Sequence, residues 1–522
     1  MKRRVRQLVL ASGCAVVALL LVVLVEHFRG SWALQARLKE LRSGGEKLQV
    51  HELLPPRISD EDNAAHAILI WTNELKKLSD KFTDLPPFMK MLSPGRAVPA
   101  WRLRRWPLKP RNSAANTPAT PTNDWASLGE FLGQARSVVD HVEDALQRPG
   151  FDLRFNYQAG FIDFQSPPLV PMKHSAQLLA VAAEDELRRG RVSEAASRLW
   201  SLAVLVERQT DERLIISQLV RFACGSIALN GTWDGLQAAG WNEDQLRQLQ
   251  TVWEGMDFPT DMARSMEMER AMTLVHFQQL QASSANRRRA LQENQQTAEL
   301  LGTSGANQGS GLLPTPVHLA LWRIAWAEQD ELRALNRWQL IIEADRLARS
   351  RPWLEAKAKF DEVEAVFGGS SIFGGTGTDD GLGWYDRCRY LFSREPFSIG
   401  GVLILKALRL ETQRKMTVTA LALQRYRLRT GRPAPDLTVL VPAFLPAVPR
   451  DNFDGQALRY RLKADGSFLL YSVGEDGRDD GGDPDAPVKV ENGPSMWTGR
   501  DAVWPALMSD EQLAAFEAGL AE

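Results

Sequence analysis

The sequence predicts a mainly α-helical protein with an N-terminal transmembrane helix and a small α+β module near the C-terminus. Three features predict this: an uncharged apolar run over residues 8–25, helical periodicity through most of residues 166–280, and two strand-like segments around Asp465-Gly466. The chain has 522 residues, more than one hydrophobic core usually serves, so we expect several structural units.

The N-terminal sequence predicts the cellular compartment of the protein. Eighteen apolar residues at ~1.5 Å per residue cover ~27 Å, about the thickness of the hydrocarbon core of a membrane. Basic residues precede this run, which favours a cytoplasmic N-terminus: Lys2, Arg3, Arg4 and Arg6. A cleaved signal peptide is the alternative, but no A-x-A-like site follows the run. We therefore expect a single-pass anchor in the bacterial inner membrane, with the bulk of the chain in the periplasm.

Charge and cysteine content exclude one class of protein and leave one question open. The chain has 63 basic and 64 acidic residues and a net charge of −1, whereas nucleic-acid-binding proteins usually show a basic excess. We expect no nucleic-acid partner. Cys224 and Cys388 lie beyond the anchor, and an oxidising compartment would let them pair, but two isolated buried thiols fit equally well.

The units expected behind the anchor follow from shifts in periodicity and composition. A short amphipathic helix is expected over Trp32 to Leu48, and glycine-rich and polar stretches separate the later helices. The predicted order is a basic tip and anchor (1–29), a mixed helix and loop region (30–165), a helical body (166–280), a flexible insertion (281–315), a helical continuation with a glycine-rich loop (316–395), an α+β module (396–490) and a C-terminal tail with a short helix (491–522).

The helical body contains one pattern of a known type. Two amphipathic helices are joined at Arg189-Gly190-Arg191, and small residues such as Ala183 and Ala195 line their apolar faces. This pair resembles one tetratricopeptide-type helical hairpin. A shift by 34 residues does not repeat the pattern, so we expect a single hairpin and no array. Farther along, Asn242 is expected to cap the helix that begins at Glu243.

A basic loop over residues 93–124 interleaves arginines with Trp101 and Trp106. Such a patch can touch anionic headgroups at a membrane surface. The alternative, which we favour, is a solvated loop whose tryptophans fold back onto the body.

No catalytic motif is found. The seven histidines are all more than five residues apart, so no H-E-x-x-H zinc motif occurs, and the chain has no G-x-S-x-G elbow, no Walker sequence and no G-x-G-x-x-G fingerprint. We therefore expect no catalytic residues, no organic cofactor and no enzymatic activity.

The C-terminal module has a recognisable order of motifs. An amphipathic helix stops at Gly431-x-Pro433, a Val448-Pro449-Arg450-Asp451 segment and a hairpin about Asp465-Gly466 follow, and Tyr471-Ser472-x-Gly474-x-Asp476-Gly477 leads into an acidic loop. Over residues 405–485 the chain resembles the C-terminal domain of type II secretion major pseudopilins. The module also resembles the tail of large bacterial envelope proteins that have one N-terminal anchor and a helical middle. The pseudopilin stem and processing site do not match.

The acidic loop is the candidate metal site. Its carboxylates, with carbonyls freed by neighbouring glycines, offer the hard oxygen ligands that Ca²⁺ prefers: Asp476, Asp479, Asp480 and Asp483. The resemblance to pseudopilins implies calcium in the same place. An exposed acidic turn without a metal is the alternative, and the spacing is not that of an EF-hand.

Together these features predict a membrane-anchored envelope scaffold or protein-interaction protein that contacts the inner membrane through residues 8–25 and binds other envelope proteins. Two alternatives stay open: a component or partner of a type II secretion or pilus-like assembly, and an envelope hydrolase whose site is assembled from distant residues.

Overall fold

The computed structural model describes residues 2–107, 122–162, 164–165, 168–300, 314–367, 382–393, 400–485 and 494–519. Helices dominate this part of the chain, as the sequence predicts. They are α1 (Lys2–Ser43), α2 (Ala64–Ile70), α3 (Thr72–Lys77), α4 (Trp125–Ala145), α5 (Val170–Arg188), α6 (Val192–Arg208), α7 (Ile215–Leu236), α8 (Glu243–Glu254), α9 (Phe258–Ala282), α10 (Ser284–Leu300), α11 (Thr315–Leu321), α12 (Ala327–Ser350), α13 (Trp353–Phe367), α14 (Trp384–Arg389), α15 (Gly400–Thr430) and α16 (Asp510–Gly519). A π-helical turn, η6 (Trp322–Trp326), joins α11 to α12.

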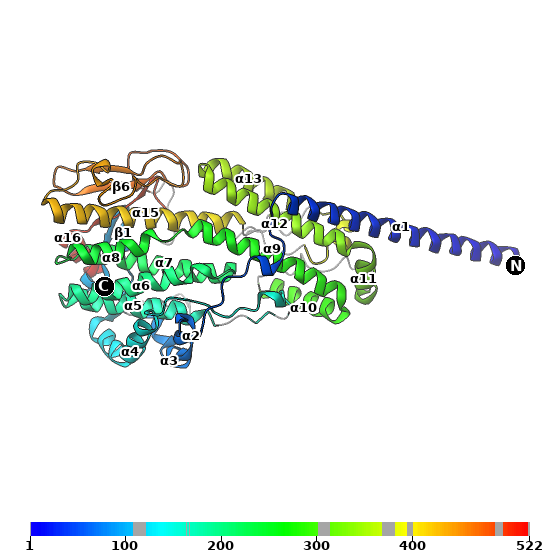
Figure 1. Cartoon of the computed structure of the whole chain (residues 1–522), viewed down its shortest axis with the longest axis horizontal. Coiled ribbons are helices and arrows are strands. Elements are labelled where there is room, and N and C mark those ends of the chain that lie inside the picture. The colour runs from blue at the N-terminus through cyan, green and yellow to red at the C-terminus, as the bar shows by residue number, and fades with distance from the viewer. Residues whose placement is uncertain are drawn as a thin grey trace.

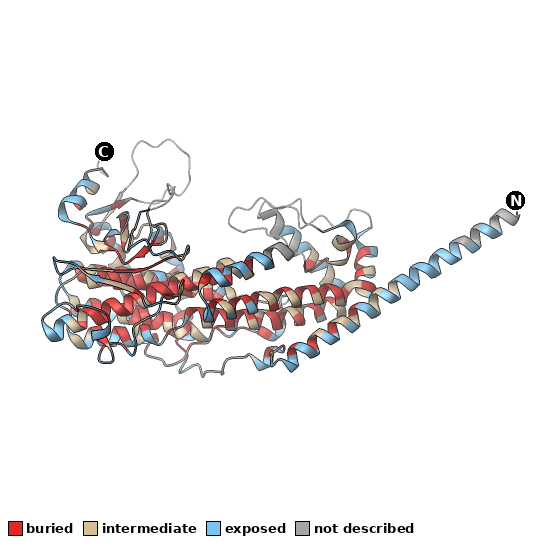
Figure 2. Cartoon of the chain, turned by 90° about the horizontal axis from the view of Figure 1, so that it is seen from above, coloured by how far each residue is buried: buried red, intermediate tan, exposed pale blue. Residues whose placement is uncertain are grey.

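Helix α1 leaves the body as a single long rod (Figure 1). The expected anchor and the expected amphipathic helix are therefore one continuous helix, which has no proline between them and runs through Gly30. Among the described residues, α1 is the one helix long and apolar enough to cross a membrane. The described side chains of its free part are mostly exposed, and buried turns begin where it meets the body (Figure 2).

The second half of α1 is fastened to α12. Leu34, Leu38 and Leu41 are buried there in a small apolar cluster that includes Leu335 of α12. Just after the helix, the Glu46 carboxylate accepts a hydrogen bond of 3.0 Å from the buried Arg270 guanidinium of α9. Apolar burial stabilises the contact, and the ion pair fixes where the helix ends.

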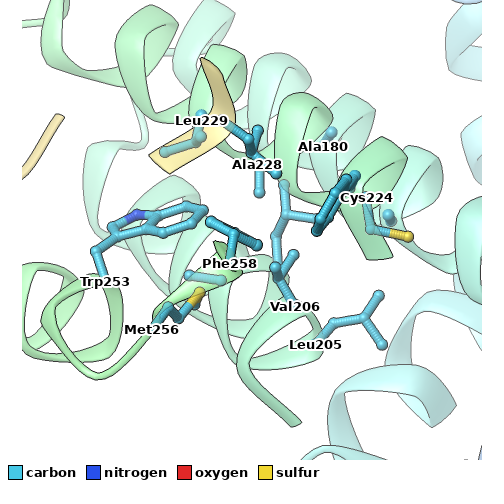
Figure 3. Packing of buried hydrophobic residues seen from close by; sticks show 14 of the residues in the cluster. Ala180, Leu205, Val206, Cys224, Ala228, Leu229, Trp253, Met256 and Phe258 are labelled. Atoms are coloured by element: carbon cyan, nitrogen blue, oxygen red, sulfur yellow. The ribbon is translucent and has the colours of Figure 1, made fainter. Parts of the chain in front are cut away.

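The main core lies between α5, α6, α7, α8, α9 and α15. Figure 3 shows part of it, where Trp253, Phe258 and Leu229 pack together with smaller side chains. The same core cluster extends from Val50 to Leu513, so segments distant in sequence share one apolar interior. Cys224 and Cys388 are each buried and unpaired, and burial raises the pKa of the Cys224 thiol to about 12.

The described residues form three small sheets, and strands β1 and β6 lie at the end of the body distant from the free part of α1 (Figure 1). Strand β6 (Phe468–Ser472) lies between β5 (Arg459–Leu462) and β7 (Ala502–Val503), with antiparallel pairing on both sides. Strand β2 (Arg96–Val98) pairs antiparallel with β1 (Lys90–Ser93) and parallel with β8 (Ala506–Leu507), and β3 (Arg105–Pro107) pairs with β4 (Thr122–Asp124). The C-terminal segment thus adds strands to two sheets and ties them together.

Several local predictions are confirmed. Helices α5 and α6 form a hairpin whose turn places Gly190 at φ 75°, a conformation that glycine adopts without steric cost. The Asn242 side chain caps α8 by accepting the N–H of Gln245 at 2.9 Å. Strands β5 and β6 pair around Asp465-Gly466. The likenesses to a tetratricopeptide hairpin and to a pseudopilin domain stay predictions.

Two regions differ from the expected structure or fall outside its description. Part of the predicted flexible insertion is helix α10, and Ala290 of that helix is buried, while residues 301–313 lie outside the described residues. Most of the predicted glycine-rich loop, residues 368–381, also lies outside them.

Candidate functional site

The acidic loop predicted from sequence follows β6, and two of its carboxylates are held by basic or phenolic groups. One oxygen of Asp479 accepts the Tyr471 hydroxyl at 2.9 Å, and the other lies 3.3 Å from Nε of Arg459. The Asp483 carboxylate accepts a hydrogen bond of 2.7 Å from Arg500. These partners occupy oxygens that a cation would need, because a carboxylate bonded to arginine is already charge-balanced.

The other two predicted ligands point elsewhere. The exposed Asp476 carboxylate accepts the backbone N–H of Arg478 at 3.0 Å, and Asp480 contributes its backbone N–H to Asp501. Within the described parts of the chain, no group of three or more histidine, cysteine, aspartate or glutamate side chains is placed to hold a metal ion. The calcium site stays a prediction.

Asp501, which the sequence did not single out, organises the loop. Its side chain is buried beside β7, and its oxygens accept the backbone N–H groups of Gly482 at 2.7 Å and Asp483 at 3.2 Å. Burial raises the pKa of Asp501 above its usual range. This aspartate lies beyond the acidic run in the sequence, so no local spacing links it to the loop.

The basic loop near residue 100 is not a free membrane patch. Trp106 is fully buried and donates Nε1–H to the carbonyl of Asp84 at 2.8 Å, and Trp101 donates to the carbonyl of Asp234 at 3.1 Å. Arg102 is paired with Asp510 at the start of α16. Both tryptophans therefore fold back onto the body, and residues 108–121 of the predicted loop lie outside the described residues.

A pocket between α9 and α12 is the strongest candidate for a binding site. Its cavity is about 410 Å³, within the range of small-molecule and side-chain pockets. Helix α10, the start of α7 and the start of α15 complete its wall. The lining is mostly apolar and includes Phe161, Ile215, Ile216, Leu219, Met266, Phe277, Ala290, Ala334, Trp338, Ile341, Phe392 and Leu403.

Three polar side chains of α9 line the pocket: Glu269, Thr273 and His276. They are spaced four and three residues apart, which places them on one face of the helix. Glu269 accepts the backbone N–H of Ile215 at 2.8 Å, where α7 begins and an N–H group has no partner within the helix. The carboxyl group of α9 therefore helps fix the position of α7.

Two of the ionisable groups in the pocket, Glu269 and His276, favour their neutral forms, while Glu293 of α10 and Arg337 of α12 also line it. Burial raises the pKa of Glu269 to about 7 and lowers the pKa of His276 to about 4. At pH 7 the imidazole is neutral and the carboxyl is partly protonated. The apolar lining and the α9 face of the pocket thus favour an apolar occupant, and Arg337 of α12 adds a cationic side chain to the lining.

Thr273 is not positioned as a nucleophile. Its hydroxyl donates to the carbonyl of Glu269 at 2.8 Å and accepts Nε1–H of Trp338 at 2.9 Å. Both bonds hold the oxygen within the wall between α9 and α12. The sequence missed this pocket because a polar residue in a helix becomes a pocket residue only through neighbours distant along the chain.

Comparison of the chain with protein-family models, with curated proteins and with solved structures finds no match.

Proposed function

We propose that the chain is a membrane-anchored interaction protein that binds an apolar segment of a partner protein in the pocket between α9 and α12. Helix α1 crosses the inner membrane with its N-terminus in the cytoplasm, and the helical body stands in the periplasm. The observation that carries the proposal is the mostly apolar lining of the pocket, in which burial shifts Glu269 and His276 toward their neutral forms.

The anchor supports a scaffold function. Helix α1 packs against α12 directly after its apolar run, and α12 forms one wall of the pocket. A binding site built on the helix that contacts the anchor would hold its partner at a defined height above the membrane. A partner that is a secretion or pilus-like assembly is the narrower version of this proposal, and it depends on the pseudopilin resemblance.

A catalytic function is the second candidate, and Glu269 is the observation that favours it. A carboxyl group with a pKa of about 7 in a pocket is suited to take and return a proton near neutral pH. A hydrolase would also require a nucleophile or an activated water at this carboxyl. The Thr273 hydroxyl is already used in two structural hydrogen bonds.

Site-specific photo-crosslinking in cells tests the binding function. A photoreactive benzoylphenylalanine replaces Ile216, which lines the pocket and is 48% exposed, and a matched control replaces Leu428, which is 46% exposed near the end of α15. We expect a discrete protein adduct at position 216 that is absent at position 428. Ala334→Phe, which places a ring in the cavity, should abolish the adduct while the melting temperature stays close to that of the parent.

Equal adducts at positions 216 and 428, or an adduct that survives Ala334→Phe, would contradict binding in the pocket.

A further inference from the structure

Apolar side chains are exposed around the end of the body from which α1 emerges. Phe28 of α1 is 67% exposed, Ile324 of η6 is 55% exposed and Trp384 of α14 is 67% exposed. Figure 1 shows α11 at this same end, with α1 continuing beyond it alone. Within η6 the burial is one-sided, because Trp322 and Ala325 are buried while Ile324 points outward.

Hydrogen bonds place η6 and α14 level with the end of the apolar run of α1. Gln329, directly after η6, donates Nε2–H to the carbonyl of Glu26 at 2.8 Å, and Glu26 is the first charged residue after that run. Arg389 of α14 donates to the Gln329 side chain at 3.0 Å. The short helix that carries Trp384 is thus connected through one glutamine to the boundary of the expected membrane span.

Aromatic contacts fix the orientation of α14. The Tyr385 ring lies 5.9 Å from the ring of Trp326 and 5.9 Å from the ring of Trp384. Trp326 belongs to η6, so α14 and η6 pack against each other through Tyr385. Trp384 remains on the outer side of this stack, where nothing in the described chain covers most of its ring.

We propose that Phe28, Ile324 and Trp384 form a membrane-facing surface that enters the headgroup region of the bilayer crossed by α1. The inference rests on the proposed anchor. Tryptophan favours the membrane–water interface, since its ring is apolar and its indole N–H stays hydrated. Apolar side chains at this level move from water into an apolar environment, and this transfer is favourable. The body therefore contacts the membrane surface through these side chains, and α1 is not its sole connection to the membrane.

Exposed apolar residues also occur elsewhere, as on most proteins, and a single one does not indicate an interaction surface. Leu428 and Val439 are examples near the C-terminal end of α15, at the far end of the body. The three residues of the membrane-facing surface differ by position: they lie on α1 itself or on elements hydrogen-bonded to one another at Glu26. At this position the bilayer crossed by α1 is what covers the three side chains.

Fluorescence quenching by spin-labelled lipid tests the surface in the full chain, reconstituted in phospholipid nanodiscs. An environment-sensitive dye (NBD) is attached to Ile324→Cys or Trp384→Cys in a Cys14→Ser background, since Cys224 and Cys388 are buried. Leu428→Cys and Val439→Cys are the matched controls. The lipid carries a nitroxide on acyl carbon 5, near the headgroup.

We expect most of the dye fluorescence to be lost at positions 324 and 384 and to be retained at positions 428 and 439. Quenching at 324 and 384 no greater than at the controls would overturn the inference, as would a blue shift without quenching, which indicates burial against protein. A dye on the native Cys14, quenched by a nitroxide on acyl carbon 12, tests the anchor separately. Quenching at Cys14 without quenching at 324 and 384 would leave the anchor intact and refute the surface alone.

Discussion

Gly30 of α1 and Gln329 of α12 approach so closely that a Cβ atom on Gly30 would lie 2.7 Å from Cγ of Gln329. The same glutamine donates to the carbonyl of Glu26. The lack of a side chain at position 30 thus lets α12 approach the backbone of α1 at the point where the free helix joins the body. This contact determines how the anchor and the body are oriented toward each other.

Gly30→Val should weaken this junction. The added side chain meets Gln329 at a distance that real side chains avoid, so we expect a cost of about 1–3 kcal/mol, as for other overpacked contacts. Thermal unfolding of the purified full chain in detergent micelles measures it as a lower melting temperature. Gly13→Val is the matched control on the same helix, because no atom lies within 4 Å of a Cβ there. An equal effect of the two substitutions would show that close packing at Gly30 is unimportant.

The contribution of Glu212 to stability should fall as pH rises from about 5 to 8. Burial raises the pKa of Glu212 to about 8, compared with 4.5 for a free glutamate. Between these values the unfolded chain loses the proton that the folded chain keeps, so the folded state is favoured fully only below about pH 4.5 and loses this advantage up to pH 8. Glu269, with a pKa of about 7, acts in the same direction.

Glu212→Gln isolates this contribution. The amide oxygen can still accept the N–H of Leu153, which the carboxylate accepts at 2.9 Å, but it has no proton to lose. We expect a smaller decrease in melting temperature between pH 5 and pH 8 than in the parent, whereas Glu61→Gln at an exposed position should leave the decrease unchanged. The same pH profile in Glu212→Gln and parent would show that Glu212 does not titrate in this range.

Calcium binding by the acidic loop is tested by melting the full chain in EDTA and in millimolar calcium. A site that binds only the folded state adds about 2.7 kcal/mol when calcium is at 100 times its Kd. If the predicted site forms, the melting temperature rises with calcium, and Asp476→Ala with Asp480→Ala removes the rise. The absence of a rise in the parent would refute the calcium prediction.

The same experiment examines Asp501. This buried carboxylate accepts backbone N–H groups of the loop, and its removal leaves these partly buried donors without a protein partner, at up to about 1–3 kcal/mol each. Asp501→Ala should therefore lower the melting temperature in EDTA more than the exposed Asp476→Ala does. Equal effects would show that Asp501 does not hold the loop.

Sequence predicted the elements whose causes are local. The turn at Gly190, the cap at Asn242 and the hairpin at Asp465-Gly466 each depend on a few adjacent residues, and the structure confirms them. The apolar run of α1 is similarly readable from composition alone. These features need no knowledge of the rest of the chain.

The pocket and the membrane-facing surface could not be predicted in the same way. The pKa of Glu269 is raised only because parts of the chain distant in sequence bury its carboxyl, and Trp384 is level with Glu26 only because Gln329 joins their elements. Helix α10 was read as a flexible insertion because its sequence is polar, although Ala290 packs into a buried cluster. Such features arise from tertiary contacts between residues far apart in sequence.

A distance measurement between Cys14 and Lys39→Cys tests the central claim, that the anchor and the body share one continuous helix. The two positions are 25 residues apart on α1, which at ~1.5 Å per residue predicts a separation of about 38 Å along the axis. Spin labels are attached at both sites of the full chain in nanodiscs, and the dipolar coupling is measured by pulsed electron paramagnetic resonance. A single narrow distribution near this distance is the predicted result. A broad distribution, or a maximum well below it, would reveal a hinge between residues 14 and 39 and contradict the account.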